Sequence, residues 1–348
     1  MFVLPSVSGH SRERGMKTTL LFLSMLFISF GCATSRNGID VTRSPAMIDG
    51  NEDDANSSVV QVKFPGNQAC TASIVGTKPL TMAFAAHCIL GSGATTPDKV
   101  TVAEIPAEKL IFDESLKDSN DDSDQLKLQF RDLAFAIFPS DLTRKLKIDD
   151  SKVFTVAPVA VRDGELVQMC GFGRTSKYYG VGNRSDYRRC GENFGFSRER
   201  MRSLAKILPD YMDDDWNEVT GPLAIWIASP SLHKRKLKSP IETVLPWIAD
   251  ARKNPSAYAM ANSGDSGGPA FKFVDGERHL LGVLSYSNSW ATEDQSKSGV
   301  SIPGMDPAKA REAMFAEYLL LTEPALKELF LKAKENGADI RGLNELLK

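Results

Sequence analysis

The sequence predicts an all-β protein of two antiparallel β-barrels followed by a C-terminal α-helix. Short apolar segments recur along the chain and alternate with turn-forming residues, a pattern typical of barrels. Near the C-terminus the apolar residues change to helical spacing. The length of 348 residues suits two packed domains, and no internal repeat is visible.

The expected strands follow in chain order. First-barrel strands are predicted at residues 59–64, 71–75, 82–85 and 133–138. Second-barrel strands are predicted at residues 153–161, 166–171, 223–227 and 280–286. Two segments compete for the last strand, residues 317–321 and residues 298–301.

The C-terminal helix has a start, a buried face and an end. Thr322 is the expected N-cap, Pro324 lies in the first turn, and Gly337 ends the helix. Its apolar face consists of Leu326, Leu329, Phe330 and Ala333. This face predicts core packing.

The N-terminus indicates export. Lys17 precedes an apolar run at residues 20–30, which is too short to span a bilayer as a helix and is typical of a secretory signal. Translation from Met16 would fit this signal better. Gly31-Cys32 at its end resembles the lipid-modified cysteine of bacterial lipoproteins. We therefore expect a signal peptide at 1–32 and a propeptide or linker at 33–47.

Two locations after export are considered. A lipidated Cys32 would tether the protein to the bacterial outer membrane, whereas ordinary cleavage nearby would release a periplasmic or secreted protein. The net charge of −2 argues against general nucleic-acid binding, and the basic run at 234–238 is expected to be a solvated loop. No cofactor and no metal are expected.

The strongest chemical signal lies at residues 264–269, which read Gly-Asp-Ser-Gly-Gly-Pro. The glycines expose the Ser266 hydroxyl and neighbouring amides, as a nucleophile and its oxyanion hole require. Upstream, His87 lies in an Ala-Ala-His-Cys run and Asp132 heads an apolar segment. The elbow of α/β-hydrolases also fits this serine, but there the acid and histidine follow it. His279 is the weak candidate for that esterase alternative.

These three motifs, in this order, resemble the trypsin/chymotrypsin-like serine endopeptidases. A Cys-Thr-Ala-Ser-Ile-Val run at residues 70–75 adds to the match. The resemblance implies two six-stranded chymotrypsin-like barrels, at 48–150 and 151–322, with the active site between them. The helix and tail at 323–348 would close the second barrel.

The resemblance also implies the chemistry of the site. Ser266 would attack a peptide carbonyl, His87 would transfer the proton, and Asp132 would orient His87. The amides of Gly264 and Ser266 would form the oxyanion hole. A monomer acting on peptides or proteins, and controlled by a proteinaceous inhibitor, would fit the family. The competing class is a catalytically silent, membrane-tethered binding protein on the same fold.

Cysteine usage agrees with export, because four cysteines remain when Cys32 is set aside. The resemblance implies a Cys70–Cys88 disulfide that holds His87. Cys170 and Cys190 would then form the second bridge, with free buried thiols as the alternative.

Substrate preference is expected to be non-basic. The position matching the floor of the specificity pocket is Met260, which either lines the pocket or packs in the core. The resemblance assigns Ser285, Tyr286 and Ser287 to the strand that pairs with substrate. A third wall lies near Ala316 or, alternatively, at residues 298–301.

Activation and two long segments complete the expectations. In the family, cleavage before a residue matching Ile48 frees an amine that pairs with Asp265, while the alternative is a simple linker into the first strand. The acidic residues at 113–124 form either a solvated loop or a calcium site. Residues 197–260 are an insertion without an assigned purpose.

Overall fold

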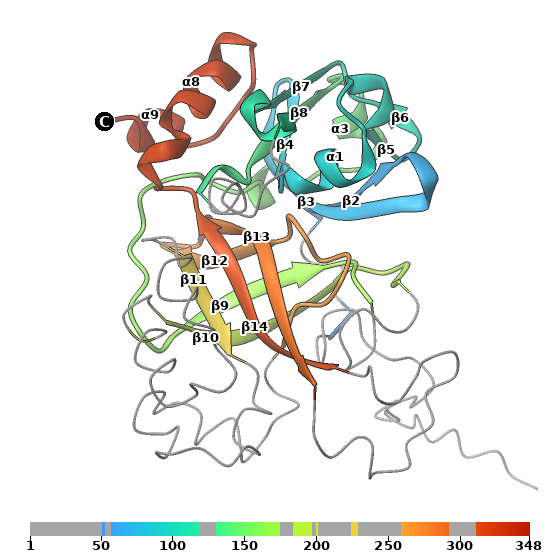
Figure 1. Ribbon diagram of the computed structural model, residues 1–348. Coiled ribbons are helices and arrows are strands. Elements are labelled where there is room, and N and C mark those ends of the chain that lie inside the picture. Colours follow the sequence, from blue (N-terminus) through green and yellow to red (C-terminus); the bar gives the residue numbers. More distant parts are fainter. Residues whose placement is uncertain are drawn as a thin grey trace, which may run out of the picture. The chain divides into compact units, whose positions relative to one another are not determined.

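The computed structural model describes most of the chain from residue 51 onward (Figure 1). The described residues are 51–52, 57–118, 130–174, 184–196, 200, 224–228, 259–291 and 311–348. The chain divides into two compact units at residues 1–40 and 41–348, and all described residues belong to the second unit.

The described strands form two antiparallel sheets, so the protein is mostly β. The members of the first sheet are β2 (Val59–Phe64), β3 (Gln68–Thr77), β4 (Leu80–Phe84), β5 (Thr101–Val102), β6 (Ile105–Pro106), β7 (Lys109–Phe112) and β8 (Ala134–Phe138). Their order across the sheet is β6-β5-β2-β3-β4-β8-β7.

The second sheet closes on itself through its hydrogen-bonded neighbours. Its members are β1 (Asn51–Glu52), β9 (Glu165–Gly171), β10 (Arg189–Phe196), β11 (Ala224–Ala228), β12 (Pro269–Val274), β13 (Glu277–Ala291) and β14 (Arg311–Leu320). The order is β1-β10-β11-β14-β13-β12-β9, and β9 also pairs with β10. Six strands therefore form a ring, to which β1 adds an edge.

Two expectations about strands need correction. Each described sheet has seven strands rather than six, because two-residue strands join the longer ones. Residues 153–161 do not form a strand. Phe154 N–H donates to the Ile74 carbonyl of the first sheet, whereas Thr155 N–H donates to the Arg278 carbonyl of the second. Because its hydrogen bonds go to both sheets, this segment is a connector.

The α/β-hydrolase alternative is also wrong, since a mostly parallel sheet is expected for that class. All strand pairings among the described residues are antiparallel. The candidate last strand at 317–321 is the end of β14, whereas residues 298–301 lie outside the described residues.

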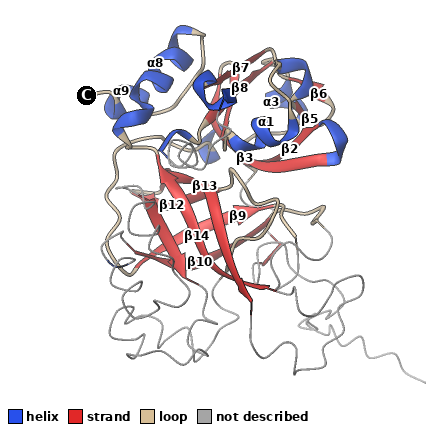
Figure 2. Cartoon of the chain, in the orientation of Figure 1, coloured by secondary structure: helices blue, strands red, loops and turns tan. Residues whose placement is uncertain are grey.

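Helices are short, and Figure 2 shows them around the first sheet and at the C-terminus. The α-helices are α1 (His87–Ser92), α3 (Leu142–Lys145), α8 (Lys327–Glu335) and α9 (Leu343–Leu346). The 3-10 turns are η1 (Pro65–Asn67), η2 (Pro97–Lys99), η3 (Glu114–Asp118), η4 (Asp150–Lys152) and η8 (Pro324–Leu326).

The C-terminal helix packs on the first sheet rather than closing the second. The Phe330 ring lies 5.3 Å from that of Phe135 in β8, and Lys109 Nζ in β7 donates to the Asn336 carbonyl. Figure 1 shows α8 beside β7 and β8. All four residues of the predicted apolar face are buried. No side-chain cap bond forms at η8 or α8, so Thr322 is not the cap.

Two strands, β4 and β8, contribute to two hydrophobic clusters of the core, one on each of their faces. Every side chain of β4 and β8 is buried, and successive side chains alternate between the two faces of a strand. Ala134, Ala136 and Phe138 fill the interior of the first sheet. The opposite face, including Phe135, packs with Phe271 of the second sheet and Phe330 of α8.

Disulfides join both pairs of cysteines that the resemblance indicated. Cys70 bonds to Cys88, and Cys170 bonds to Cys190. The second bridge links directly paired residues of β9 and β10. No helix among the described residues is long and apolar enough to cross a membrane.

Candidate active site

Two paired strands of the first sheet bring His87 and Asp132 together. In the antiparallel register Phe84, the last residue of β4, pairs with Ala134, the first residue of β8. The chain after β4 and the chain before β8 therefore meet at one edge of the sheet. His87 follows Phe84 by three positions, and Asp132 precedes Ala134 by two.

Asp132 holds His87 through both carboxylate oxygens. His87 Nδ1 lies 2.7 Å from Asp132 Oδ2, and the His87 backbone N–H donates to Oδ1 at 2.7 Å. The Asp132 side chain is only 2% exposed, whereas that of His87 is 35% exposed. This double contact fixes the ring, and its other nitrogen has no hydrogen-bond partner among the described residues.

The pKa of His87 is raised above its ordinary value of 6.5. Burial alone lowers this pKa, but the negative charge of Asp132 and its hydrogen bond to the ring raise it more. The imidazolium form is therefore stabilised, as a group that accepts a proton during a reaction requires.

The second sheet contributes a further donor to Asp132. Ser285 Oγ donates to Asp132 Oδ2 at 2.6 Å. Ser285 lies at an irregularity in the pairing of β13 with β14, between Leu284 and Tyr286. The resemblance assigned Ser285 to substrate binding, and the structure adds this contact between the two sheets.

Ser266 lies in a tight turn immediately before β12. Gly267 N–H donates to the Leu284 carbonyl at 2.7 Å, which holds the turn against β13. Gly267 has φ +78°, and a Cβ there would lie 2.7 Å from the Ala85 nitrogen. Only glycine fits, and this close approach places Ser266 beside the segment that leads to His87. Among the described residues, no hydrogen bond yet joins the Ser266 hydroxyl to His87.

Thr71 of β3 clamps the same turn from the first sheet. Its backbone N–H donates to the Ser266 carbonyl at 2.9 Å, and its hydroxyl donates to the Gly264 carbonyl at 3.2 Å. The hydroxyl also accepts from Phe172 N–H at 3.1 Å. Thr71 is fully buried. Sequence reasoning missed this role, although a hydroxyl residue among apolar strand neighbours was a signal.

The backbone amides of Gly264 and Ser266 have no hydrogen-bond acceptor among the described residues. Arg174 N–H donates to the Ser263 carbonyl at 2.9 Å. Because carbonyl and N–H point in opposite directions across a trans peptide, the Gly264 N–H points away from Arg174. Gly264 has φ +97°, a conformation that L side chains rarely adopt. These amides can hold a developing oxyanion.

Asp265 is a fully buried carboxylate next to Ser266. Its Oδ1 accepts from Gly173 N–H at 2.7 Å, and its Oδ2 accepts from Asn262 N–H at 2.8 Å. Burial raises its pKa to about 7, and the two hydrogen bonds offset this only in part. No cation among the described residues forms an ion pair with it.

The expected specificity residues lie in two environments. Met260 is 1% exposed and packs in an apolar cluster with Ala316 and Tyr318. Tyr286 is 45% exposed. Met260 therefore packs in the core, the alternative that the sequence left open. The side chain of Ser287 lies outside the described residues.

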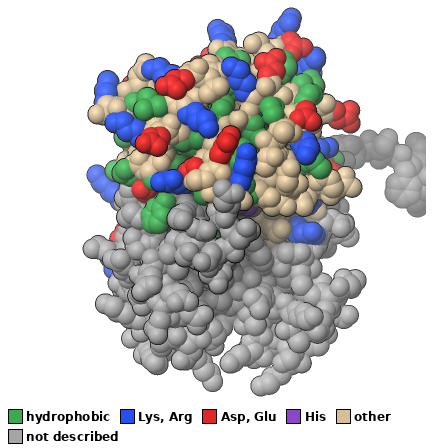
Figure 3. Space-filling view, turned by 45° about the horizontal axis from the view of Figure 1, so that its top comes forward, with side chains coloured by type: hydrophobic (Ala, Val, Ile, Leu, Met, Phe, Trp, Pro, Cys, Tyr) green, Lys and Arg blue, Asp and Glu red, His purple; other side chains and the backbone are tan. Residues whose placement is uncertain are grey.

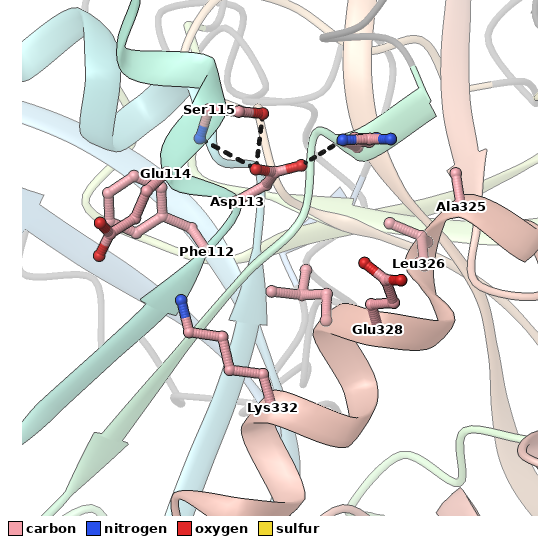
Figure 4. Close-up of a pocket in the computed structure, with 10 residues that line it drawn as sticks. Phe112, Asp113, Glu114, Ser115, Ala325, Leu326, Glu328 and Lys332 are labelled. Carbon is pink, nitrogen blue, oxygen red and sulfur yellow. Dashed lines mark hydrogen bonds and ion pairs between the residues drawn. The ribbon is translucent and has the colours of Figure 1, made fainter.

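A separate cavity of about 380 Å³ lies between η3 and α8 (Figure 4). Its lining includes Asp113 and Arg131 on one side and Lys332 on the other, and it contains none of His87, Asp132 or Ser266. Asp113 Oδ2 accepts from Arg131 at 2.8 Å. This ion pair anchors the residue that precedes Asp132.

The acidic segment holds no metal-ligand cluster in its described part. No group of three or more His, Cys, Asp or Glu suited to a metal occurs among the described residues. Asp113 accepts hydrogen bonds from Ser115 and Arg131. Partial burial acts to raise the pKa of Asp113, but these hydrogen bonds and the charge of Arg131 together lower it below its ordinary value. Residues 119–124 lie outside the described part of the chain.

Several expected features cannot be placed. The signal peptide, Cys32, the propeptide or linker, and Ile48 lie outside the described residues. Most of the 197–260 insertion lies outside them too. On the face shown in Figure 3, acidic and basic side chains of the described residues are interspersed.

Comparisons with known proteins do not assign the chain to a family. No protein-family model matches it, and no curated protein matches it. An interpretation of the site therefore depends on the residues and their geometry.

Proposed function

We propose that this protein is a serine endopeptidase of the trypsin/chymotrypsin class, with Ser266, His87 and Asp132 as its triad. The observation that carries the proposal is an imidazole held by Asp132, together with a serine turn that closely approaches the segment before His87 and has two backbone amides without an acceptor among the described residues. In this proposal the two antiparallel sheets correspond to the two barrels of the chymotrypsin-like fold. The edge of the first sheet supplies His87 and Asp132, and the turn before β12 of the second sheet supplies Ser266.

The geometry supports acyl transfer in two stages. Ser266 Oγ attacks the peptide carbonyl while His87 takes its proton, and the oxyanion accepts hydrogen bonds from the Gly264 and Ser266 amides. His87 then donates the proton to the leaving amine as the carbon–nitrogen bond breaks. Water repeats the sequence on the acyl-enzyme, and Ser266 regains its proton.

We propose an apolar rather than basic side chain before the scissile bond. The position that the resemblance matches to the pocket floor is a methionine, Met260, rather than a carboxylate that could pair with a basic side chain. The exposed Tyr286 provides an apolar surface for the preceding substrate residues.

Activation by cleavage before Ile48 belongs to the same proposal. A free amine there would pair with Asp265, whose buried carboxylate has two hydrogen bonds and no ion-pair partner among the described residues. We also propose export, with Cys32 as a lipid anchor that holds the uncleaved chain at the bacterial outer membrane and from which cleavage before Ile48 would release the enzyme.

The test is intact-mass analysis of the purified protein before and after reaction with a fluorophosphonate probe. Wild type should gain one probe on a chain that begins at Ile48. Ser266→Ala and His87→Ala should gain none, because the nucleophile or its base is missing. Ser151→Ala, which changes an exposed serine elsewhere, should label like wild type.

The outcomes separate the candidate classes. Labelling of Ser266→Ala, or proteolysis that survives His87→Ala, would contradict the triad. An unreactive chain that begins at Ile48 would favour the catalytically silent binding protein. An unreactive, uncleaved chain that labels after cleavage before Ile48 would support the activation step.

A further inference from the structure

Arg184 lies directly beside the proposed oxyanion hole. Its Nε is 3.5 Å, and its Cδ 3.9 Å, from the point where a Cβ on Gly264 would stand. Its Nη1 donates to the carbonyl of Asn67, in the turn between β2 and β3, at 3.2 Å. The guanidinium therefore spans from the nucleophile turn to the first sheet.

A second arginine reinforces the positive charge. Arg174 and Arg184 face each other in an isolated antiparallel bridge. Arg174 is also the residue whose N–H fixes the Ser263 carbonyl. Both arginines are thus tied by backbone contacts to the wall around Gly264.

Asp186, two residues after Arg184, is the nearest acid in the sequence. Among the described residues, Arg184 forms no ion pair with a carboxylate. Its pKa is lowered, first by partial burial and then by the charge of Arg174. An anion placed beside Arg184 would relieve both effects.

The positions of Ser285 and Gly264 indicate which part of a bound substrate would lie near Arg184. Under the proposed function, the acyl part of a substrate runs along Ser285, Tyr286 and Ser287. We infer that the chain after the scissile bond continues past Gly264, where Arg184 and its partner Asn67 lie.

We propose that Arg184, supported by Arg174, selects substrates with an acidic side chain within the first three residues after the scissile bond. This inference rests on the proposed function and adds the substrate class of its leaving-group side. The guanidinium would bind the carboxylate with charge-assisted hydrogen bonds. Neutral or basic residues at those positions would leave the Arg184 guanidinium without a carboxylate partner.

The experiment profiles the cleavage of a peptide library by the activated full chain. Cleaved peptides are identified by mass spectrometry, and the residues after each cut are compared with their frequency in the library. Wild type should enrich aspartate and glutamate by about fivefold to tenfold in kcat/KM over matched alanine peptides. Arg184→Gln should lose the enrichment, and Arg184→Glu should favour lysine and arginine instead.

Controls keep the result interpretable. Arg144→Glu makes the same charge reversal at an exposed position on α3 and should keep the acidic preference. Ser266→Ala identifies cuts made by contaminating proteases. Fluorophosphonate labelling of both Arg184 variants shows whether their active sites are assembled.

Each outcome bears on a different statement. An enzyme that labels at Ser266 and cuts peptides without acidic preference overturns this inference alone. The same holds if Arg184→Gln, labelled normally, retains the preference. Failure of the activated wild type to label and to cut overturns the proposed function and this inference with it.

Discussion

At the residue scale, the hydrogen bond between Asp132 and His87 determines the proton chemistry of the site. Asp132 is buried and accepts from the His87 ring, from the His87 backbone and from Ser285. It therefore sets both the orientation of the ring and the pKa of His87. The consequence can be measured as a pH dependence.

Asp132→Asn should slow fluorophosphonate labelling of Ser266 by about ten-thousandfold, because the ring loses its tautomer and its orientation. Only neutral His87 can accept a proton, so the wild-type rate should rise with pH through a midpoint above 6.5. In Asp132→Asn this midpoint should move to lower pH, because burial then acts without the opposing charge. The rate constant is measured against pH. Asp141→Asn, at the N-cap of α3, is the control. An unshifted midpoint in Asp132→Asn would contradict the role of Asp132 in raising the pKa of His87.

At the element scale, β3 matters because it clamps the nucleophile turn. Thr71 provides three hydrogen bonds from the first sheet to residues 172, 264 and 266. A strand of one sheet thereby determines the shape of a loop of the other. Sequence patterns for strands do not reveal such a contact.

Thr71→Val should lower the free energy of unfolding by about 1–3 kcal/mol, since the partly buried Phe172 N–H and Gly264 carbonyl lose their hydroxyl partner. It should also slow labelling of Ser266, because the turn is no longer held. Urea unfolding and the labelling rate measure the two effects. Thr71→Ser keeps the hydroxyl and should restore most of both. Equal behaviour of Thr71→Val and wild type would show that the clamp is unimportant.

At the scale of the whole molecule, the two sheets share a core, and Asp265 is buried near their junction. The pKa of Asp265 is raised to about 7 from 3.8, so the folded protein binds a proton there that the unfolded chain releases. The stability that this proton contributes is present below pH 3.8 and is lost as pH rises through about 7. The full window corresponds to about 4 kcal/mol.

In the uncleaved chain, the free energy of unfolding should therefore contain a component from Asp265 that falls between about pH 4 and pH 7. Asp265→Asn should remove that component while lowering stability overall, because an amide cannot accept both N–H groups. Urea unfolding across this pH range gives the difference in slope, with the exposed Asp98→Asn as control. If cleavage before Ile48 supplies an amine, the slope should also vanish in the cleaved wild type. A wild-type slope equal to that of Asp265→Asn would refute the prediction.

The predictability of the fold differs among its elements. Strands such as β2 and β9 lie close to the segments that the apolar pattern indicated. The segment at 153–161 has the same apolar character but connects the sheets, because its hydrogen-bonding groups find partners in both. The α8 face was predicted from its spacing, whereas the sheet that it covers was not. Periodicity shows that a face is buried without naming its partner.

The sequence by itself determined the residue types of the candidate site, their order along the chain and the apolar faces of the elements, while the cysteine pairs followed from the family resemblance and were confirmed by the structure. It could do so because these features are local or depend on a few spaced motifs. Only the tertiary structure decided that Ser285 and Thr71 tie the two sheets together, that Met260 packs inward, and that Arg184 lies against Gly264. Those contacts join residues distant in sequence, and side chains meet there only once the register and packing of both sheets are established.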